Sequence, residues 1–162
     1  MKTKLILIAI AIFGTTYVAK SQTSDAEAEA VINLLGVQKR EAIHKLVAVS
    51  PKDSVAFWKI YDEYLAQNKA TAKSRMRLYE RTAEAYVNMS PVIADSLATQ
   101  YFQNRMGQEK TLEEYYKKIK SATNPVTAFQ FYQAEVYILT SIRANIMSQI
   151  PTYGQLVNAA KK

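Results

Sequence analysis

The sequence predicts an all-α protein of four helices, in which the second and third form a long, elongated hairpin. Gly and Pro are scarce, at four residues each, which argues against a turn-rich all-β architecture. A capping residue followed by proline occurs three times and marks helix starts. Apolar residues recur at intervals of three and four, whereas no period-two pattern persists for six residues.

The N-terminal segment 1–21 has the pattern of a secretory signal peptide. A positive start at Met1–Lys4 precedes the apolar run Leu5–Phe13, and small residues follow at Ala19 and Ser21. We expect cleavage before Gln22, and therefore a periplasmic protein. An uncleaved membrane anchor is the alternative, but the apolar run is short for a span.

Removal of this segment leaves a mildly basic helical domain at 22–151. Without Lys2, Lys4 and Lys20, 18 of the 21 basic residues remain against 14 acidic ones, a formal charge of +4. This charge requires no nucleic-acid partner. No later stretch approaches the roughly 20 apolar residues of a membrane span, so we expect no stable membrane insertion after cleavage. The absence of cysteine excludes disulfides and thiolate chemistry.

Three helix starts share one pattern: Ser50-Pro51, Ser90-Pro91 and Asn124-Pro125. The Ser and Asn side chains accept hydrogen bonds from first-turn N–H groups, and proline fits the next position because its missing N–H costs nothing there. These marks predict helices over 25–48, 51–88, 91–121 and 125–150. The tail 152–162 is expected to fray.

Each helix after the first carries an apolar stripe of helical period. In 51–88 the stripe consists of Tyr61, Tyr64, Ala72, Met76, Tyr79, Ala83 and Tyr86, preceded by Phe57 and Trp58. In 91–121 it consists of Ile93, Leu97, Tyr101, Leu112, Tyr115 and Ile119. In 125–150 it consists of Phe129, Tyr132, Val136, Leu139, Arg143, Ile146 and Ile150, a coiled-coil-like seam that we expect to be covered by the other helices or by a second copy.

The predicted helix lengths are unequal, which favours an elongated arrangement. About 38 residues in the second helix would span about 57 Å, far longer than the first helix. We therefore expect the first and fourth helices to pack along the hairpin of the other two. A second copy could complete the bundle as an intertwined or antiparallel homodimer.

A basic row in the second helix is a candidate binding surface. Its members, spaced by four, are Lys69, Lys73, Arg77 and Arg81. Such a row could attract acidic client segments, and Met76, Tyr79 and Tyr86 could supply contact area. The alternative is a solvated helix face with Glu80 and Glu84 as partners.

Arg143 needs a partner if its apolar seam is buried. Glu135 lies eight residues back, and Glu109 or Glu113 on another helix is an equal candidate. We expect a structural ion pair here.

No cofactor, metal site or catalytic residue is predicted. The single histidine, His44, has only Glu41 nearby, too few ligands for zinc. The chain has no G-x-S-x-G elbow, no Gly-rich phosphate loop and no H-E-x-x-H. A hydrolase without these motifs remains a third, lower-ranked hypothesis.

Two helix starts and the last helix resemble the Spy/CpxP family of periplasmic helical proteins, over roughly residues 45–151. The family's L-T-x-x-Q motifs correspond to residues 49–53 (VSPKD) and 122–130 (ATNPVTAFQ), both without the leucine. The last helix is similar to diverged members described as sensors, in Phe129, Gln130, Glu135, Ile142, Arg143 and Ile150-Pro151.

The resemblance implies a cradle-shaped antiparallel dimer that holds unfolded clients without ATP, and some relatives bind zinc or restrain a sensor kinase. Two functions therefore follow as hypotheses. The first is a periplasmic, ATP-independent binding protein of the chaperone or envelope-stress adaptor type, which captures apolar or acidic client segments. The second is a dedicated sensor or accessory subunit for one envelope signalling partner.

Overall fold

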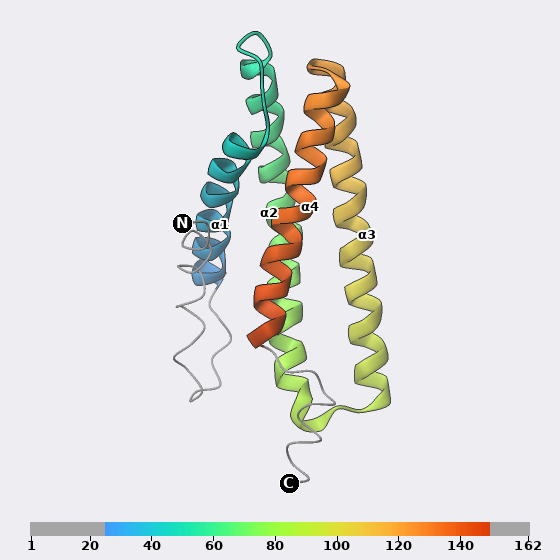
Figure 1. Cartoon of the computed structure of the whole chain (residues 1–162). Coiled ribbons are helices and arrows are strands. Elements are labelled where there is room, and N and C mark those ends of the chain that lie inside the picture. Colours follow the sequence, from blue (N-terminus) through green and yellow to red (C-terminus); the bar gives the residue numbers. More distant parts are fainter. Residues whose placement is uncertain (1–24, 150–162) are drawn as a thin grey trace.

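The computed structural model describes residues 25–149, which form a bundle of four α-helices (Figure 1). They are α1 (Asp25–Leu46), α2 (Ser54–Ala85), α3 (Pro91–Ala122) and α4 (Pro125–Gln149), and a 3-10 turn, η1 (Tyr86–Asn88), follows α2. The predicted all-α fold is thereby confirmed. The expected signal peptide, its cleavage site and the C-terminal tail lie outside the described residues.

Consecutive helices run antiparallel, and α2 and α3 form the predicted elongated hairpin (Figure 1). Each of these two helices has 32 residues, or about 48 Å, whereas α1 has 22 and α4 has 25. α1 packs on α2 and α4, and α4 also packs on α3. Within residues 25–149, no helix combines the length and apolar character needed to cross a bilayer.

Two of the three predicted helix starts are confirmed in their capping geometry. The Ser90 hydroxyl accepts a hydrogen bond from the Ile93 N–H over 3.3 Å, with proline at the first helical position. Asn124 Oδ1 accepts from the N–H groups of Val126 and Thr127 at 2.9 and 3.0 Å. These bonds satisfy first-turn donors that would otherwise lack partners.

The start predicted at Pro51 is wrong by three residues. Residues 51–53 form a turn, in which the Asp53 N–H donates to the Ser50 carbonyl over 3.0 Å, and α2 begins at Ser54. The Ser50 hydroxyl donates to the Asp53 carboxylate over 2.7 Å. Because Ser50 is engaged with a side chain, it caps no helix N–H, and α2 is shorter than expected.

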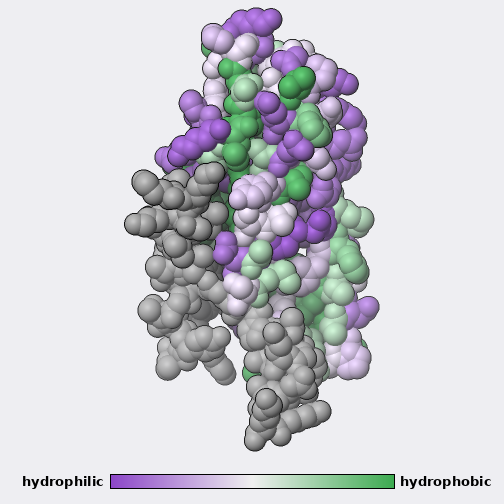
Figure 2. All heavy atoms as spheres, viewed as in Figure 1, coloured by the Kyte–Doolittle hydropathy of each residue, from purple (hydrophilic) through white to green (hydrophobic). Residues whose placement is uncertain are grey.

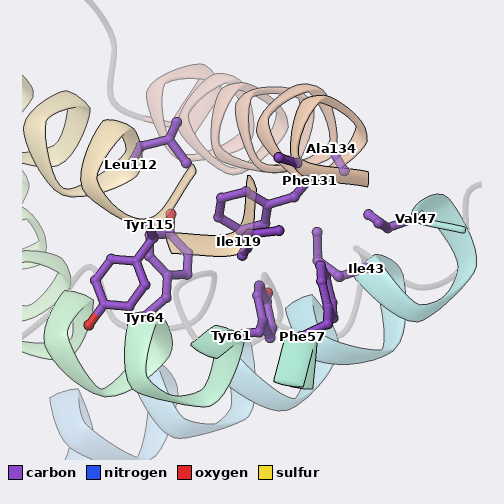
Figure 3. Close-up of a cluster of buried hydrophobic side chains, with 11 residues drawn as sticks. Ile43, Val47, Phe57, Tyr61, Tyr64, Leu112, Tyr115, Ile119, Phe131 and Ala134 are labelled. Carbon is purple, nitrogen blue, oxygen red and sulfur yellow. The ribbon is translucent and has the colours of Figure 1, made fainter. Parts of the chain in front are cut away.

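The main core lies toward the end of the bundle that holds the α1–α2 and α3–α4 connections (Figures 1 and 3). All four helices contribute to it. Its buried members are Ile43, Val47, Phe57, Tyr61, Tyr64, Leu112, Tyr115, Ile119, Ala128, Phe131 and Ala134. Phe131 meets the rings of Tyr61 and Tyr64 edge-on, at centroid distances of 6.1 and 5.4 Å. The aromatic residues of the second helix are thus explained by packing against α4 as well as α1.

The seam predicted for the last helix does not face the core of the chain itself. The residues of α4 that face the core are Thr127, Ala128, Phe131, Ala134 and Glu135. The seam expected to pack instead turns outward, since Phe129 is 51% exposed and Val136 36% exposed. The core-facing residues of α4 and the predicted seam both recur at intervals of three and four residues. The core-facing stripe contains alanines, which allow close helix approach, and its single carboxylate finds partners inside the bundle.

Candidate protein-binding face and the carboxylate behind it

Glu135 lies at the centre of a buried polar cluster formed by three helices. Its side chain is 0% exposed. Oε1 accepts a hydrogen bond from the Tyr61 hydroxyl over 3.0 Å, and Oε2 accepts one from the Tyr64 hydroxyl over 2.8 Å. Lys39 of α1 places its Nζ 2.8 Å from Oε2 and is itself only 11% exposed. One carboxylate therefore joins α1, α2 and α4.

The cluster is internally satisfied, as a buried charge must be. The Lys39 ammonium also lies 5.2 Å from the centroid of the Tyr64 ring. Burial raises the pKa of Tyr61 and of Tyr64 above the ordinary value of 10, and the negative charge of Glu135 raises both further. Both hydroxyls thus stay protonated as donors, and the cluster is suited to fixing helix register rather than to proton transfer.

The sequence predicted Glu135 as one candidate partner for Arg143 and as part of the family resemblance of the last helix, but not as a buried residue. A signal for its burial was present: Glu135 is the single acidic residue of 125–149, and it lies between Ala134 and Val136. The sequence could not show that Tyr61, Tyr64 and Lys39 converge on it, because these residues lie 71 to 96 positions away.

The start of α4 is tied to the link between α1 and α2. The Ala48 N–H donates to Gln130 Oε1 over 3.0 Å, and the Thr127 hydroxyl donates to the Ala48 carbonyl over 3.4 Å. The two stretches that resemble the family motifs, 49–53 and 122–130, are therefore brought to the same end of the bundle. These contacts hold α4 in the orientation that turns its apolar seam outward.

The outward side of α4 carries no charged residue among its exposed positions. We call it the α4 outer face, and its exposed members are Val126, Phe129, Tyr132, Gln133, Val136, Tyr137, Thr140, Ala144 and Met147. Of the two charged residues in the helix, Glu135 is buried and Arg143 half-buried. Figure 2 views the side on which α4 lies in front, and hydrophobic side chains reach the surface there among hydrophilic ones.

This face differs from the usual outer side of an amphipathic helix, which is covered with charged and polar groups. Phe129 and Tyr132 stack on each other with ring centroids 6.4 Å apart. Tyr137 is 64% exposed on the same helix. An uncharged helix face that exposes several aromatic side chains is typical of a protein-binding site.

The ion pair expected for Arg143 is not formed with any of the three predicted partners. Glu135 pairs with Lys39, Glu109 lies 3.8 Å from Arg105, and Glu113 pairs with Lys117. Within the part of the chain that the structure describes, Arg143 makes no ion pair. The expectation failed because it assumed that the seam of α4 faces inward.

A second arginine near Arg143 is also without a carboxylate partner in the described range. Arg75 of α2 donates a short hydrogen bond to Gln108 Oε1, a neutral acceptor that is itself buried. Burial lowers the pKa of Arg75, and the nearby charge of Arg143 lowers it further. This region of the bundle therefore holds two guanidinium groups that form no ion pair with a described carboxylate.

The predicted basic row does not form one open face. Each step of four residues overshoots a full turn, so the row rotates by about 120° from first to last member. Lys69 accordingly reaches Glu29 of α1 at 2.7 Å, whereas Arg81 donates to Gln100 of α3. Lys73, between them, is half-buried.

Arg77 is the remaining member of the basic row. It lies 2.9 Å from Glu80, which was named as a partner in the alternative of a solvated helix face.

The residues predicted to supply contact area, Met76, Tyr79 and Tyr86, are buried to different degrees. Tyr79 is buried with its ring centroid 5.8 Å from that of Tyr101, and Met76 and Tyr86 are half-buried. The set thus offers less open surface than the α4 outer face.

His44 is stacked on Trp58 with ring centroids 5.6 Å apart, and Arg40 covers the same indole at 4.4 Å. In residues 25–149 no three His, Asp or Glu side chains are grouped as metal ligands would be.

One shallow hollow, open to solvent, is lined by Ile60, Lys117, Lys118, Ser121 and Ala122. Its lining contains neither a carboxylate nor a histidine.

The chain matches no known family model, no curated protein and no solved structure. The resemblance to the Spy/CpxP family therefore stays a prediction from the sequence. The class that the described residues define is an elongated, antiparallel four-helix bundle, in which the exposed positions of α4 carry no charge.

Proposed function

We propose that this chain is a periplasmic, ATP-independent binding protein of the chaperone or envelope-stress adaptor type, and that it holds other proteins on the α4 outer face. The observation that carries the proposal is the absence of charge at every exposed position of α4 from 125 to 148. Covering such a face removes apolar area from water, which contributes about 25 cal/mol per Å² before the costs of association.

Aromatic groups make this face suitable for partners of varied shape. Phe129, Tyr132 and Tyr137 provide rigid contact area with little loss of side-chain entropy on binding, and Met147 adds an adaptable apolar group. The basic row of Lys69, Lys73, Arg77 and Arg81 serves in this proposal to steer acidic segments rather than to contact them. No catalytic step is part of the proposal.

Suppression of client aggregation tests this function. A thermally unfolding model client is mixed with equimolar protein, and light scattering is followed at low and at moderate salt. We expect the wild type to delay aggregation. The double variant Phe129→Ser/Val136→Glu should lose most of this protection, because it places a charge and a polar group on the apolar face.

The matched control is Val55→Glu in α2, which introduces the same charge at a valine that is 83% exposed. It should protect as the wild type does, and circular dichroism should show that every variant is folded. Absence of protection by the wild type would refute the chaperone activity, and full protection by the double variant would refute the assignment to α4. If the wild type protects the client less well at moderate salt than at low salt, electrostatic attraction by the basic row contributes to client binding.

The alternative is a dedicated subunit for one envelope signalling partner. The regular spacing of the α4 outer face favours it, since a surface built for one helical partner has such a repeat. A pull-down from envelope extract separates the two functions. One stoichiometric partner that is lost in Phe129→Ser/Val136→Glu supports the dedicated subunit, and many partners support the broad binding protein.

A further inference from the structure

The α4 outer face has the repeat of a helix-binding seam. Its exposed members Phe129, Tyr132 and Val136 are followed along the helix by the half-buried Leu139 and Arg143, so that Phe129, Val136 and Arg143 recur at every seventh residue. From 126 to 147 the face extends over about three heptads, or about 32 Å. A partner that contacts each member in turn must share this spacing, which a second helix does and an extended strand does not.

Arg143 determines what that partner helix must carry. It is half-buried within the seam and forms no ion pair with any described residue. The charge of Arg75 lies nearby, and Arg75 itself bonds only to the neutral Gln108 among the described residues. A wholly apolar partner would remove Arg143 from water without compensation, at a cost of several kcal/mol.

A second copy of α4 cannot supply the missing charge. Its only carboxylate is Glu135, which is fully buried and already bonded to Lys39, Tyr61 and Tyr64. Two copies paired in parallel would also place Arg143 against its own counterpart. The charge pattern therefore disfavours a dimer in which two α4 outer faces pair with each other.

We propose that the partner of the α4 outer face is an amphipathic helix of about three heptads with one carboxylate in its apolar seam, and that this carboxylate pairs with Arg143. This inference rests on the proposed function and specifies its substrate class. It predicts that recognition has two parts, an apolar repeat that provides contact area and a single charge that fixes register.

Binding of designed peptides to the full protein tests the inference. The probe is a fluorescent 21-residue peptide with leucine at the a and d positions and glutamate at one a position in a terminal heptad. It is compared with versions that carry glutamine or lysine there, and with a scrambled peptide of the same composition. Placing the glutamate in the first or the last heptad distinguishes parallel from antiparallel docking.

We expect the best-placed glutamate peptide to bind about tenfold more tightly than the glutamine peptide, as a charge-assisted pair in a partly desolvated seam should. The variant Arg143→Gln should abolish this preference, and Arg143→Glu should transfer it to the lysine peptide. The control Arg105→Gln removes a charge from the exposed side of α3 and should leave the preference unchanged.

Equal binding of the glutamate and glutamine peptides, or a preference that survives in Arg143→Gln, would overturn the inference. Binding of the scrambled peptide with the same affinity would overturn the helical repeat. A dimer in light scattering that Val136→Glu dissociates would assign the face to a second copy and overturn it as well. The peptide-binding results do not depend on aggregation suppression, which is measured separately, so failure of the inference and failure of the proposed function are distinguishable.

Discussion

Tyr64 and Glu135 lie 71 residues apart in the sequence and are joined by a hydrogen bond of 2.8 Å in the interior of the bundle. The same carboxylate accepts a second bond from Tyr61 and pairs with Lys39. Because all three partners are donors, the charge of Glu135 organises the packing of α1, α2 and α4 around one point.

Replacing Glu135 with glutamine should destabilise the protein strongly. The substitution keeps the volume but leaves the Lys39 ammonium buried without a counter-ion, which costs about 3–5 kcal/mol in comparable buried pairs. Urea denaturation followed by circular dichroism measures the loss. The exposed residue Glu63 on α2 offers the matched control, and Glu63→Gln should stay within about 0.5 kcal/mol of the wild type. If Glu135→Gln and Glu63→Gln have similar free energies of unfolding, the polar cluster around Glu135 does not stabilise the fold.

Stability should fall as the pH rises above about 10. The pKa of Tyr61 and of Tyr64 is raised in the folded protein by burial and by Glu135, whereas in the unfolded chain both titrate near 10. Above that value the unfolded chain releases protons that the folded protein retains, so the free energy of unfolding decreases with pH. The variants Tyr61→Phe and Tyr64→Phe should each flatten this decrease in denaturation curves recorded between pH 8 and 11. If neither variant changes the slope of the free energy of unfolding against pH, the pH dependence does not come from Tyr61 and Tyr64.

Two phenylalanines on α4 distinguish its inner from its outer stripe. Phe131 is fully buried, and Phe131→Ala should cost about 3–5 kcal/mol through lost contacts and a cavity. Phe129 is half exposed, and Phe129→Ala should cost less than about 1 kcal/mol. Thermal and urea denaturation of the two variants check the difference. The reverse order would mean that the seam predicted from the sequence is the buried one.

The side chains of Asn124 and Ser50 should differ in their contribution to stability. Asn124→Ala removes an acceptor for two N–H groups at the start of α4 and should cost about 1 kcal/mol. Ser50→Ala removes only a bond to the Asp53 carboxylate in the turn before α2 and should cost less. Chemical denaturation of the two single variants measures both effects. A larger loss for Ser50→Ala would show that the turn is the more important of the two.

The helix boundaries were predictable because the signals that set them are local. Ser90-Pro91 and Asn124-Pro125 cap their helices as predicted, and the long second helix follows from an uninterrupted pattern without Gly or Pro. The error at Ser50-Pro51 is also local: the carboxylate of Asp53 engages the serine that the pattern assigned to the helix.

The candidate site was predicted less well. The residues chosen on α2 form a regular row in the sequence, yet its ends contact α1 and α3, because the row winds around the helix. Three members of the α4 outer face, Phe129, Tyr132 and Val136, were recognised as part of a seam, which was expected to be covered by the other helices or by a second copy. Periodicity finds a stripe without showing which of two equivalent stripes meets the rest of the chain.

The sequence by itself determined that the described residues are mainly helical, that α3 and α4 begin at Pro91 and Pro125, and that α2 and α3 form a long hairpin. These features were predictable because caps, proline and helical period act over a few residues. Only the tertiary structure decided that α4 turns Phe131 and Glu135 inward and leaves Phe129 and Val136 in solvent. That choice depends on Lys39, Tyr61 and Tyr64, which reach Glu135 from other helices, and a buried charge is stable only where such partners converge.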